Sequence, residues 1–177
     1  DTGDSVRKPA SYAGLVGFKP TWGRISRFGL FPFAPSLDHV AYFTRSVEDS
    51  ALSLSLLAGR DNHDATSSTK PVEDYAKAIN NPIKGVKIAV LREVVDSIDD
   101  KNILEAFNNT IKELKKQGAV VEYVDFSIKL LESIYPTYMV ISCAEATSNN
   151  ANLDGIKFGP RYEADAYTDV MIKARTK

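Results

Sequence analysis

Residues 86–126 carry the pattern that most limits the fold, because two short apolar runs flank one long amphipathic segment. The runs VKIAVL (86–91) and AVVEYVDF (119–126) have the length and β-branched content of buried strands. Between them, residues 100–118 form a helix pattern that ends at Gly118. Its apolar residues recur at helical spacing: Ile103, Leu104, Phe107, Ile111 and Leu114. A β-α-β unit within one sheet is normally parallel and right-handed. The sequence therefore predicts an α/β fold in which this segment is scaffold rather than active site.

A second helix is predicted to begin directly after Ser46. This residue is a suitable N-cap, Asp49 lies three residues further on, and Gly59 ends the apolar run ALSLSLLA. The polar, proline-containing segment RDNHDATSSTKPVEDY (60–75) follows and predicts a connecting loop. His63 lies within it, and we expect its side chain to be solvated.

The C-terminal part of the chain is predicted to be mainly helical. A helical region is expected from about Ile128 through Asn150, with an interruption near Pro136, since proline lacks a backbone donor and clashes with the preceding turn. The next residues, NLDGIKFGPR, indicate a loop built around Gly155 and Gly159, and a final helical tail follows.

Residues 1–45 are rich in Gly, Pro and aromatic residues and lack a long periodic run. This composition predicts loops and short strands packed on a larger body. Eight aromatic residues lie between Tyr12 and Phe43. A segment that is merely an exposed loop region would not need so many, so we expect them to be buried as anchors.

The bulk composition excludes several classes of protein. A net charge of -1 over 177 residues gives no support for dominant electrostatic binding of nucleic acid. Two histidines and one cysteine make a zinc site improbable, and no metal ligands are predicted. No apolar run approaches the roughly 20 residues that a membrane-spanning helix needs. A single cysteine excludes an internal disulfide and favours a reducing, cytoplasmic location, and Cys143 is expected to be a small buried thiol. Because the chain begins on Asp1 and not on Met, we expect a piece of a longer protein.

The opening stretch DTGDSV places Ser5 among residues that suit a tight turn. A serine becomes a nucleophile only when a base takes its proton and donors stabilise the oxyanion that it creates. A glycine-containing turn can supply converging backbone N–H groups, but a turn or capping serine remains the simpler interpretation. No base is evident in the sequence. His39, oriented by Asp38, is formally possible, although adjacent residues align poorly as the base and orienter of a triad.

The segment DTGDSVRKPASYAGLVGFKPTWGRISRFGL, from Asp1 to Leu30, closely resembles the second half of the amidase signature. That pattern runs D-T-G-G-S-[IV]-R-x-P-A and then G-[LV]-x-G-[FLM]-K-P-T-x-G-R-[VI]-S. The likeness continues through SLDHVAYFTRSVEDSALSLSLLAGRD. Downstream, PTYMVISCAEATSNNANLDGIKFGPR is similar to one branch of the family, the A subunits of the glutamine-dependent aspartyl/glutamyl-tRNA amidotransferases. The resemblance covers nearly the whole chain and implies the amidase-signature fold, a large mixed β-sheet flanked by helices.

The resemblance implies a Ser-Ser-Lys triad in which Ser5 is the acyl-ester nucleophile. The backbone N–H groups of Thr2, Gly3, Asp4 and Ser5 are then expected to hold the oxyanion, and Tyr138 to line the glutamine pocket. A core aromatic on a helix is an equally good interpretation of Tyr138. The lysine and the bridging serine of the family belong to a segment before Asp1, and the family's further pocket residues, an arginine and an acid, lie beyond Lys177. Residues 1–177 are therefore expected to be a partial amidase domain that hydrolyses no glutamine alone.

The branch also implies partners and cofactors. Glutamine is the ammonia donor, and B and C subunits complete a heterotrimer. Misacylated tRNA is bound mainly through the B subunit. No cofactor is expected on this chain, whereas ATP and Mg²⁺ are expected at the partner subunit, where Glu-tRNA(Gln) or Asp-tRNA(Asn) is activated.

Two departures from the family pattern stand out. Asp4 occupies a position where the family usually has glycine, and it is expected to adopt a left-handed conformation or to pair with Arg7 or Lys8. Ala41 and Tyr42 replace a usual Gly-Pro, which predicts a local backbone change without loss of chemistry. Neither Lys8 nor Lys19 matches the family's lysine, and Lys19 is expected to be structural.

Two alternatives remain open from the sequence. One is a stand-alone amidase of the same family that acts on small or peptide amides. The other is a non-catalytic module with the same fold, which Asp4 and the missing triad members would suit.

Overall fold

The β-α-β segment forms as predicted in the computed structural model, which describes residues 1–176. Strand β3 (Lys87–Leu91) pairs in parallel with β4 (Val120–Val124), and α5 (Lys101–Lys116) connects them. Asp100 caps α5 by accepting hydrogen bonds from the N–H groups of Asn102 and Ile103, at 2.8 and 3.1 Å. Gly118 turns the chain with a φ of 93°. The structure also contains α4 (Arg92–Asp96), a short helix that the sequence did not predict.

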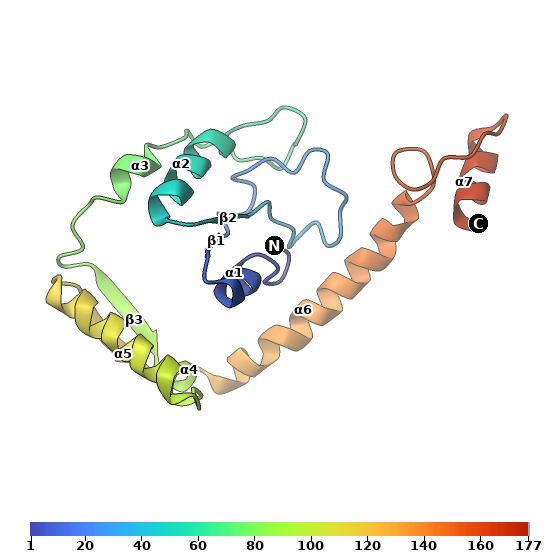
Figure 1. The fold of residues 1–177 in the computed structure, drawn as a ribbon. Helices are drawn as coiled ribbons and strands as arrows, with labels where there is room; N and C mark the ends of the chain where they lie inside the picture. Colours follow the sequence, from blue (N-terminus) through green and yellow to red (C-terminus); the bar gives the residue numbers. More distant parts are fainter. Residues whose placement is uncertain (177) are drawn as a thin grey trace. The chain divides into compact units, whose positions relative to one another are not determined.

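This segment is the centre of one of two compact units. Unit 2 comprises Asn80–Thr137, and unit 1 comprises Asp1–Ile79 together with Tyr138–Lys177, of which Lys177 lies outside the described residues. Figure 1 shows α5 alongside β3. Val90 of β3, Ile111 of α5 and Ala119 are each buried, and α5 contacts β4 as the periodicity predicts. Ile103, at the start of the predicted apolar stripe, is exposed instead.

Unit 1 begins with α1 (Arg7–Ala13), β1 (Val16–Phe18), β2 (Tyr42–Thr44), α2 (Val47–Leu57) and α3 (Tyr75–Ala78). The strands β1 and β2 pair antiparallel, with Gly17 opposite Phe43. Gly17 permits α1 to approach β1, because a Cβ there would lie 2.6 Å from the Cβ of Ala10 and 2.9 Å from the carbonyl oxygen of Val6. Two two-stranded sheets, one antiparallel and one parallel, are therefore present within residues 1–176, and the α/β class is confirmed.

The prediction of loops and short strands for residues 1–45 is wrong at α1. The heptapeptide RKPASYA is helical, with Pro9 in its first turn, where a missing N–H costs nothing, and with Gly14 left-handed at φ 65° behind it. These are ordinary start and stop signals that lay within a glycine- and proline-rich context. By contrast, α2 begins as predicted, since the Ser46 hydroxyl accepts a hydrogen bond from the Asp49 N–H at 3.0 Å.

Tyr42 has a structural role at the departure from the Gly-Pro pattern. Its ring stacks on Phe18 with the ring centroids 5.5 Å apart, and its hydroxyl donates to the Ser50 carbonyl at 2.7 Å. Burial of the ring raises the pKa of the Tyr42 hydroxyl. The segment thus joins β1, β2 and α2 through one side chain.

The helix α6 (Ile128–Asn149) runs without a break through Pro136, so the predicted interruption is wrong. It is followed by a short 3₁₀ turn (Asn150–Asn152) and by α7 (Tyr167–Thr176), which confirms the helical tail. The boundary between the two units falls inside α6, directly after Pro136 and Thr137. A proline removes one hydrogen bond of the helix without ending it when the turns on either side remain paired.

Burial was overestimated in two places. Cys143 is exposed, not buried, because it lies on a face of α6 that other described residues do not cover. Six of the eight aromatic residues of the N-terminal segment are also exposed, since one two-stranded sheet and short helices offer little apolar surface to cover them. These six are Tyr12, Trp22, Phe28, Phe31, Phe33 and Phe43.

Candidate active site

The Ser5 loop (Asp1–Val6) forms a turn, as the sequence predicts, and leads directly into α1, which the sequence did not predict. The Ser5 side chain is exposed at this turn. Among residues 1–176, no main-chain carbonyl accepts a hydrogen bond from the N–H groups of Thr2, Gly3, Asp4 or Ser5. An oxyanion site needs such uncommitted donors close to the nucleophile.

The loop is closed by Asp1, whose carboxylate is fully buried. Its Oδ2 accepts hydrogen bonds from the N–H groups of Val6 and Arg7, at 3.3 and 3.2 Å, and thereby satisfies the start of α1. The Arg7 guanidinium donates to both oxygens of Asp1 at 3.1 Å and also donates to the Gly3 carbonyl. Charge-assisted bonds at both ends of the loop fix the path of the chain around Ser5.

Tyr138 and Gly3 are brought together although they are far apart in the sequence. A Cβ on Gly3 would lie 2.9 Å from both Cζ and the hydroxyl oxygen of Tyr138. The Tyr138 ring therefore covers the loop, and only glycine fits beneath it without movement. Tyr138 is partly buried, so the structure places it at the loop and not in the interior of a core. Its assignment to a glutamine pocket remains a prediction.

Asp4 does not adopt the left-handed conformation, since none of the non-glycine residues in 1–176 has a positive φ. This expectation is wrong, and the turn is formed with ordinary backbone angles. Of the two proposed partners, Lys8 pairs with Asp4 at 3.8 Å, with both side chains more than half exposed, while Arg7 is taken up by Asp1. A long ion pair in solvent contributes little, so it directs the Asp4 carboxylate toward Lys8 without holding it tightly.

The Ser-His-Asp alternative is not formed. Both oxygens of Asp38 accept hydrogen bonds from other groups, namely the Thr2 hydroxyl and the N–H groups of Phe33 and Ala34. The His39 Nδ1 lies 2.6 Å from the Leu37 carbonyl oxygen instead, and burial lowers the pKa of the His39 ring. Asp38 therefore does not orient His39 as a base.

Lys19 has the structural contact that was expected of it. Its Nζ donates to the Pro20 carbonyl at 3.1 Å. Burial, with a smaller contribution from the nearby positive charge of Arg7, lowers the pKa of the Lys19 ammonium. This environment follows from packing beside the loop and does not require a catalytic role.

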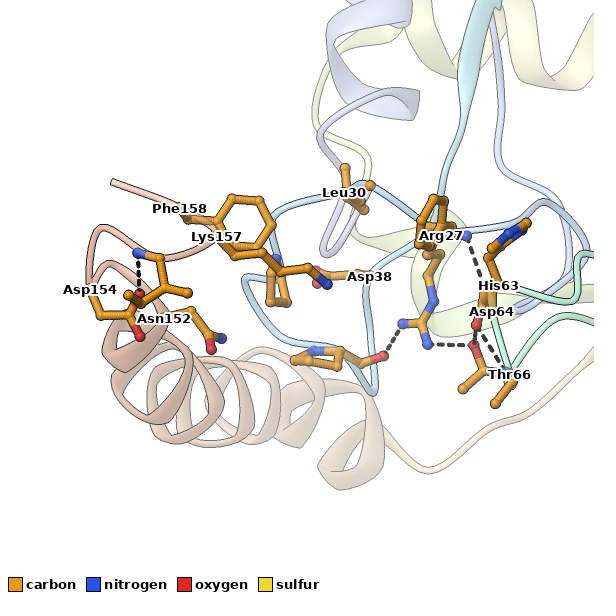
Figure 2. A pocket seen from close by; sticks show the side chains of 16 residues that line it. Arg27, Leu30, Asp38, His63, Asp64, Thr66, Asn152, Asp154, Lys157 and Phe158 are labelled. Carbon is orange, nitrogen blue, oxygen red and sulfur yellow. Dashed lines mark hydrogen bonds between the residues drawn. The ribbon is translucent and has the colours of Figure 1, made fainter. Parts of the chain in front are cut away.

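A cavity of about 950 Å³ in unit 1 is lined in part by Asp38 and was missed by the sequence analysis. Figure 2 shows Arg27 and His63 at one end, and Lys157 and Phe158 at the other. The two terminal nitrogens of Arg27 donate to the Pro35 carbonyl and to the Thr66 hydroxyl, whereas its buried Nε has no hydrogen-bond partner among the described residues. None of Thr2, Gly3, Asp4, Ser5 or Tyr138 lines the cavity. The glycines and prolines of the segment 27–35 were the available signal for an open loop surface.

No three His, Cys, Asp or Glu side chains within the described chain lie close enough to hold a metal ion. In the same residues, no helix has both the length and the apolar character needed to cross a membrane.

The chain resembles known proteins over its whole length. The family model described as Amidase matches residues 1–177. The A subunit of the glutamyl-tRNA(Gln) amidotransferase of Fusobacterium nucleatum is 46% identical over 180 residues, which cover 100% of this chain and 36% of that protein. The corresponding A subunit of Akkermansia muciniphila is 42% identical over 177 residues, or 100% of this chain and 37% of that protein.

The chain is also similar to solved structures of amidotransferase A subunits and amidases. The crystal structure of the A subunit of the glutamyl-tRNA(Gln) amidotransferase from Thermotoga maritima aligns with a TM-score of 0.76 at 40% identity, over 86% of this chain and 33% of that chain. The native peptide amidase from Stenotrophomonas maltophilia aligns with a TM-score of 0.72 at 28% identity, over 86% of this chain and 31% of that chain. The chain thus spans about a third of the length of the relatives it matches.

Proposed function

Because the chain belongs to the amidase family, we propose that it is part of the A subunit of a tRNA-dependent amidotransferase, in which Ser5 carries the acyl group of glutamine. Its likeness to relatives with that name, at 42–46% identity over the whole chain, favours this branch. The observation that carries the assignment to this site is the Ser5 loop, whose N–H groups at residues 2–5 are free of main-chain acceptors beside an exposed serine.

The proposed reaction is an acyl transfer in two halves. The Ser5 Oγ forms a bond to the side-chain amide carbon of glutamine, and its proton passes to a base. The carbonyl oxygen becomes an oxyanion that the loop N–H groups stabilise. The C–N bond then breaks and the nitrogen leaves as ammonia with the transferred proton. Water subsequently cleaves the ester, which releases glutamate and restores the hydroxyl of Ser5.

Side chains around the loop are suited to support this chemistry. Arg7 and Asp1 fix both ends of the turn, so little reorganisation is needed when the oxyanion forms. Tyr138 lies over Gly3, where it can bound one side of a glutamine pocket. We propose that the base is a lysine acting through a bridging serine, both outside residues 1–177, and that units 1 and 2 belong to one amidase domain.

We further propose that the ammonia is used by a partner. Glu-tRNA(Gln) or Asp-tRNA(Asn), bound mainly by the B subunit, is activated there with ATP and Mg²⁺ and converted to Gln-tRNA(Gln) or Asn-tRNA(Asn). A C subunit completes a heterotrimer that acts in the cytoplasm. No cofactor is assigned to the present chain.

A stand-alone amidase is the second candidate, and the likeness to a peptide amidase structure favours it. The two candidates differ in their dependence on partners. Glutamine hydrolysis that rises when ATP, misacylated tRNA and the partner subunits are added supports the amidotransferase. Hydrolysis that ignores these additions, together with turnover of peptide amides, supports the amidase.

The decisive variant is Ser5→Ala in the full-length protein, assembled with its partner subunits. We expect loss of glutamine-dependent ammonia release by about 10³-fold or more, because the acyl ester cannot form. Transamidation supplied with free ammonia should continue at the original rate. The matched control is Ser11→Ala, a nearby exposed serine whose hydroxyl donates only to the Lys8 carbonyl at 2.7 Å, and it should leave both activities unchanged.

Retention of glutamine hydrolysis by Ser5→Ala would remove Ser5 from the chemistry and would suit a non-catalytic module. Loss of both activities would mean that Ser5 is required for folding or assembly, and the proposed role as nucleophile would then be wrong.

A further inference from the structure

Asp38 lies far from the Ser5 loop in the sequence but is hydrogen-bonded to it in the structure. Its side chain is buried, with the residue 4% exposed. Its Oδ1 accepts hydrogen bonds from the Thr2 hydroxyl at 2.7 Å and from the Ala34 N–H at 3.2 Å. Its Oδ2 accepts from the Phe33 N–H at 3.0 Å. Both oxygens are thus engaged, and of these donors only the Thr2 hydroxyl belongs to the loop.

The segment that carries Asp38 is itself held on two sides. On one side, the Asp1 nitrogen donates to the His39 carbonyl at 2.8 Å. On the other side, the Glu145 carboxylate of α6 accepts from the N–H of Ser36 at 3.0 Å and from its hydroxyl. Asn149 of the same helix donates to the Phe33 carbonyl at 3.4 Å. Asp38 therefore has a fixed position against which Thr2 is set.

The helix that anchors this segment also carries Tyr138. Tyr138, Ser142, Glu145 and Asn149 are spaced at four, three and four residues, so they share one face of α6. Ser142 on this face is 2% exposed. One helix face thus contacts Gly3 directly through Tyr138, and it is linked to Thr2 indirectly through the segment 33–39, which contains Asp38.

We propose that Asp38 is a positioning residue for the oxyanion site, acting through its hydrogen bond to the Thr2 hydroxyl. Fixing the Thr2 side chain restricts the rotation of the main chain at residue 2, and this sets the direction of the N–H groups that follow. The proposal rests on the proposed function, because it supposes that these N–H groups meet an oxyanion. A displacement of about 1 Å in such a donor can cost about 10²-fold in rate.

A purely structural role for Asp38 makes a different prediction. Its bonds to Phe33 and Ala34 stabilise the turn at residues 33–38. Their loss would lower the stability of the fold and would not lower kcat in preference to changing KM. The bond to Thr2 can be removed alone, since valine has the shape of threonine without its hydroxyl. In Thr2→Val, the Asp38 Oδ1 keeps its bond to Ala34, so the carboxylate is not left without a donor.

The test uses Thr2→Val, Thr2→Ser and Asp38→Asn in the full-length protein within its assembled complex. We measure kcat and KM for glutamine hydrolysis, the rate of ammonia-supplied transamidation, and the thermal midpoint. The control is Thr66→Val, which removes another threonine hydroxyl that donates to an aspartate, Asp64 Oδ1, at 2.5 Å in the same unit, and which also removes the acceptor of an Arg27 N–H.

The expected result for Thr2→Val is a fall in kcat of about 10- to 100-fold with KM changed less than about twofold, because the oxyanion donors matter mainly in the transition state. Thr2→Ser restores the hydroxyl and should remain within about threefold of the original kcat. Asp38→Asn should lower kcat at least as far as Thr2→Val does, because in either orientation of the amide its NH₂ group faces a backbone N–H, of Phe33 or of Ala34, as donor against donor. Ammonia-supplied transamidation should persist in all three variants, and Thr66→Val should keep the original kcat.

The proposal is overturned if Thr2→Val keeps the original kcat, or if Thr2→Val and Thr66→Val lower both activities and the thermal midpoint alike. Ser5→Ala is measured in parallel, so that failure of the proposed function can be told apart from failure of the proposed role of Asp38. If Ser5→Ala abolishes glutamine hydrolysis while Thr2→Val is normal, the proposed function stands and the role of Asp38 fails. If Ser5→Ala remains active, the proposed function fails, and the oxyanion role of Asp38 fails with it.

Discussion

The Ser5 loop and the β-α-β segment of unit 2 are ordered by different kinds of interaction. The loop is held by polar bonds from residues distant in the chain, such as Thr2 to Asp38, and by the contact of Gly3 with Tyr138. The β-α-β segment is held by the parallel pairing of its strands and by buried apolar side chains, among them Ile111 of the helix and Val90 of β3. The loop is irregular backbone, whereas the segment is regular structure with a small core.

Because of this difference, the loop interactions mainly position catalytic groups, whereas the core interactions mainly contribute to folding stability. Polar bonds have directions, so they can aim N–H groups to within the tolerance that catalysis needs. Apolar packing is not directional, and it contributes free energy in proportion to the area removed from water. We therefore expect substitutions in the loop to change rate more than stability, and substitutions in the β-α-β core to do the reverse.

The largest effect is expected from Ile111→Ala in α5. Removing a buried aliphatic side chain leaves a cavity and should lower the free energy of unfolding by about 2–4 kcal/mol. Glutamine hydrolysis by the protein that remains folded should be unchanged. Denaturant unfolding and steady-state kinetics on the full-length protein measure the two quantities.

Ile103→Ala is the control for that substitution, because Ile103 lies on the same helix and is 60% exposed. It should cost well under about 1 kcal/mol, as for most surface positions. A fall in kcat with Ile111→Ala that matches its loss of stability would contradict the expected difference between the two regions, since the β-α-β core would then also set the position of the Ser5 loop.

The next effect is expected from Gly3→Ala. The added Cβ would meet the Tyr138 ring at 2.9 Å, so either the ring or the loop must move. We expect kcat/KM for glutamine to fall about 10-fold, equivalent to about 1.4 kcal/mol, with a smaller change in unfolding free energy. A double-mutant cycle with Tyr138→Ala checks the cause.

In the Tyr138→Ala background, Gly3→Ala should have little further effect, because the clash is already relieved. Additive losses in the double variant would show that Gly3 acts through its own backbone conformation and not through Tyr138.

The smallest effect concerns Asp61, in the loop that precedes α3. A hydrogen bond from the Ser26 hydroxyl, followed by bonds from the His63 N–H and ring, lowers the pKa of the Asp61 carboxyl from 3.8 to about 2. A carboxyl with a lowered pKa stabilises the fold above its unfolded value and loses this contribution as the pH falls through its folded value. The thermal midpoint should therefore depend less on pH between 3.8 and about 2 in Asp61→Asn than in the original protein.

Ser26→Ala should change that dependence in the same direction but less, because it removes only the largest of the causes that lower the pKa of Asp61. An unchanged pH dependence in Asp61→Asn would mean that the carboxyl gains nothing from its partners. Because Asp61 does not contact the Ser5 loop, neither variant should alter kcat at neutral pH.

The fold was predictable where a pattern is local and repeated. The cap at Ser46 and the stripe of α5 follow directly from neighbouring residues. Prediction failed where a local signal was outweighed by its surroundings. Pro136 disfavours a helix, yet α6 continues through it, and the region around Arg7–Ala13 is rich in glycine and proline, yet α1 forms there.

The candidate site was predictable only in part, for a related reason. Ser5 and Tyr138 came from likeness to a family, and the structure brings Tyr138 to the loop. Asp38 was considered only as a partner for its neighbour His39, because sequence proximity was the only available guide. Its contact with Thr2 spans 36 positions, and no spacing rule connects them.

By itself, the sequence determined the α/β class, the parallel pairing of β3 and β4, and the turn that presents Ser5, because each depends on residues within a few positions or on one periodic face. Only the tertiary structure decided that Asp38 meets Thr2, that Tyr138 covers Gly3, and that Asp4 keeps an ordinary backbone conformation. These outcomes depend on which distant donors and acceptors come within about 3 Å of one another, the range of a hydrogen bond. Chain folding sets that distance, and the order of residues does not reveal it.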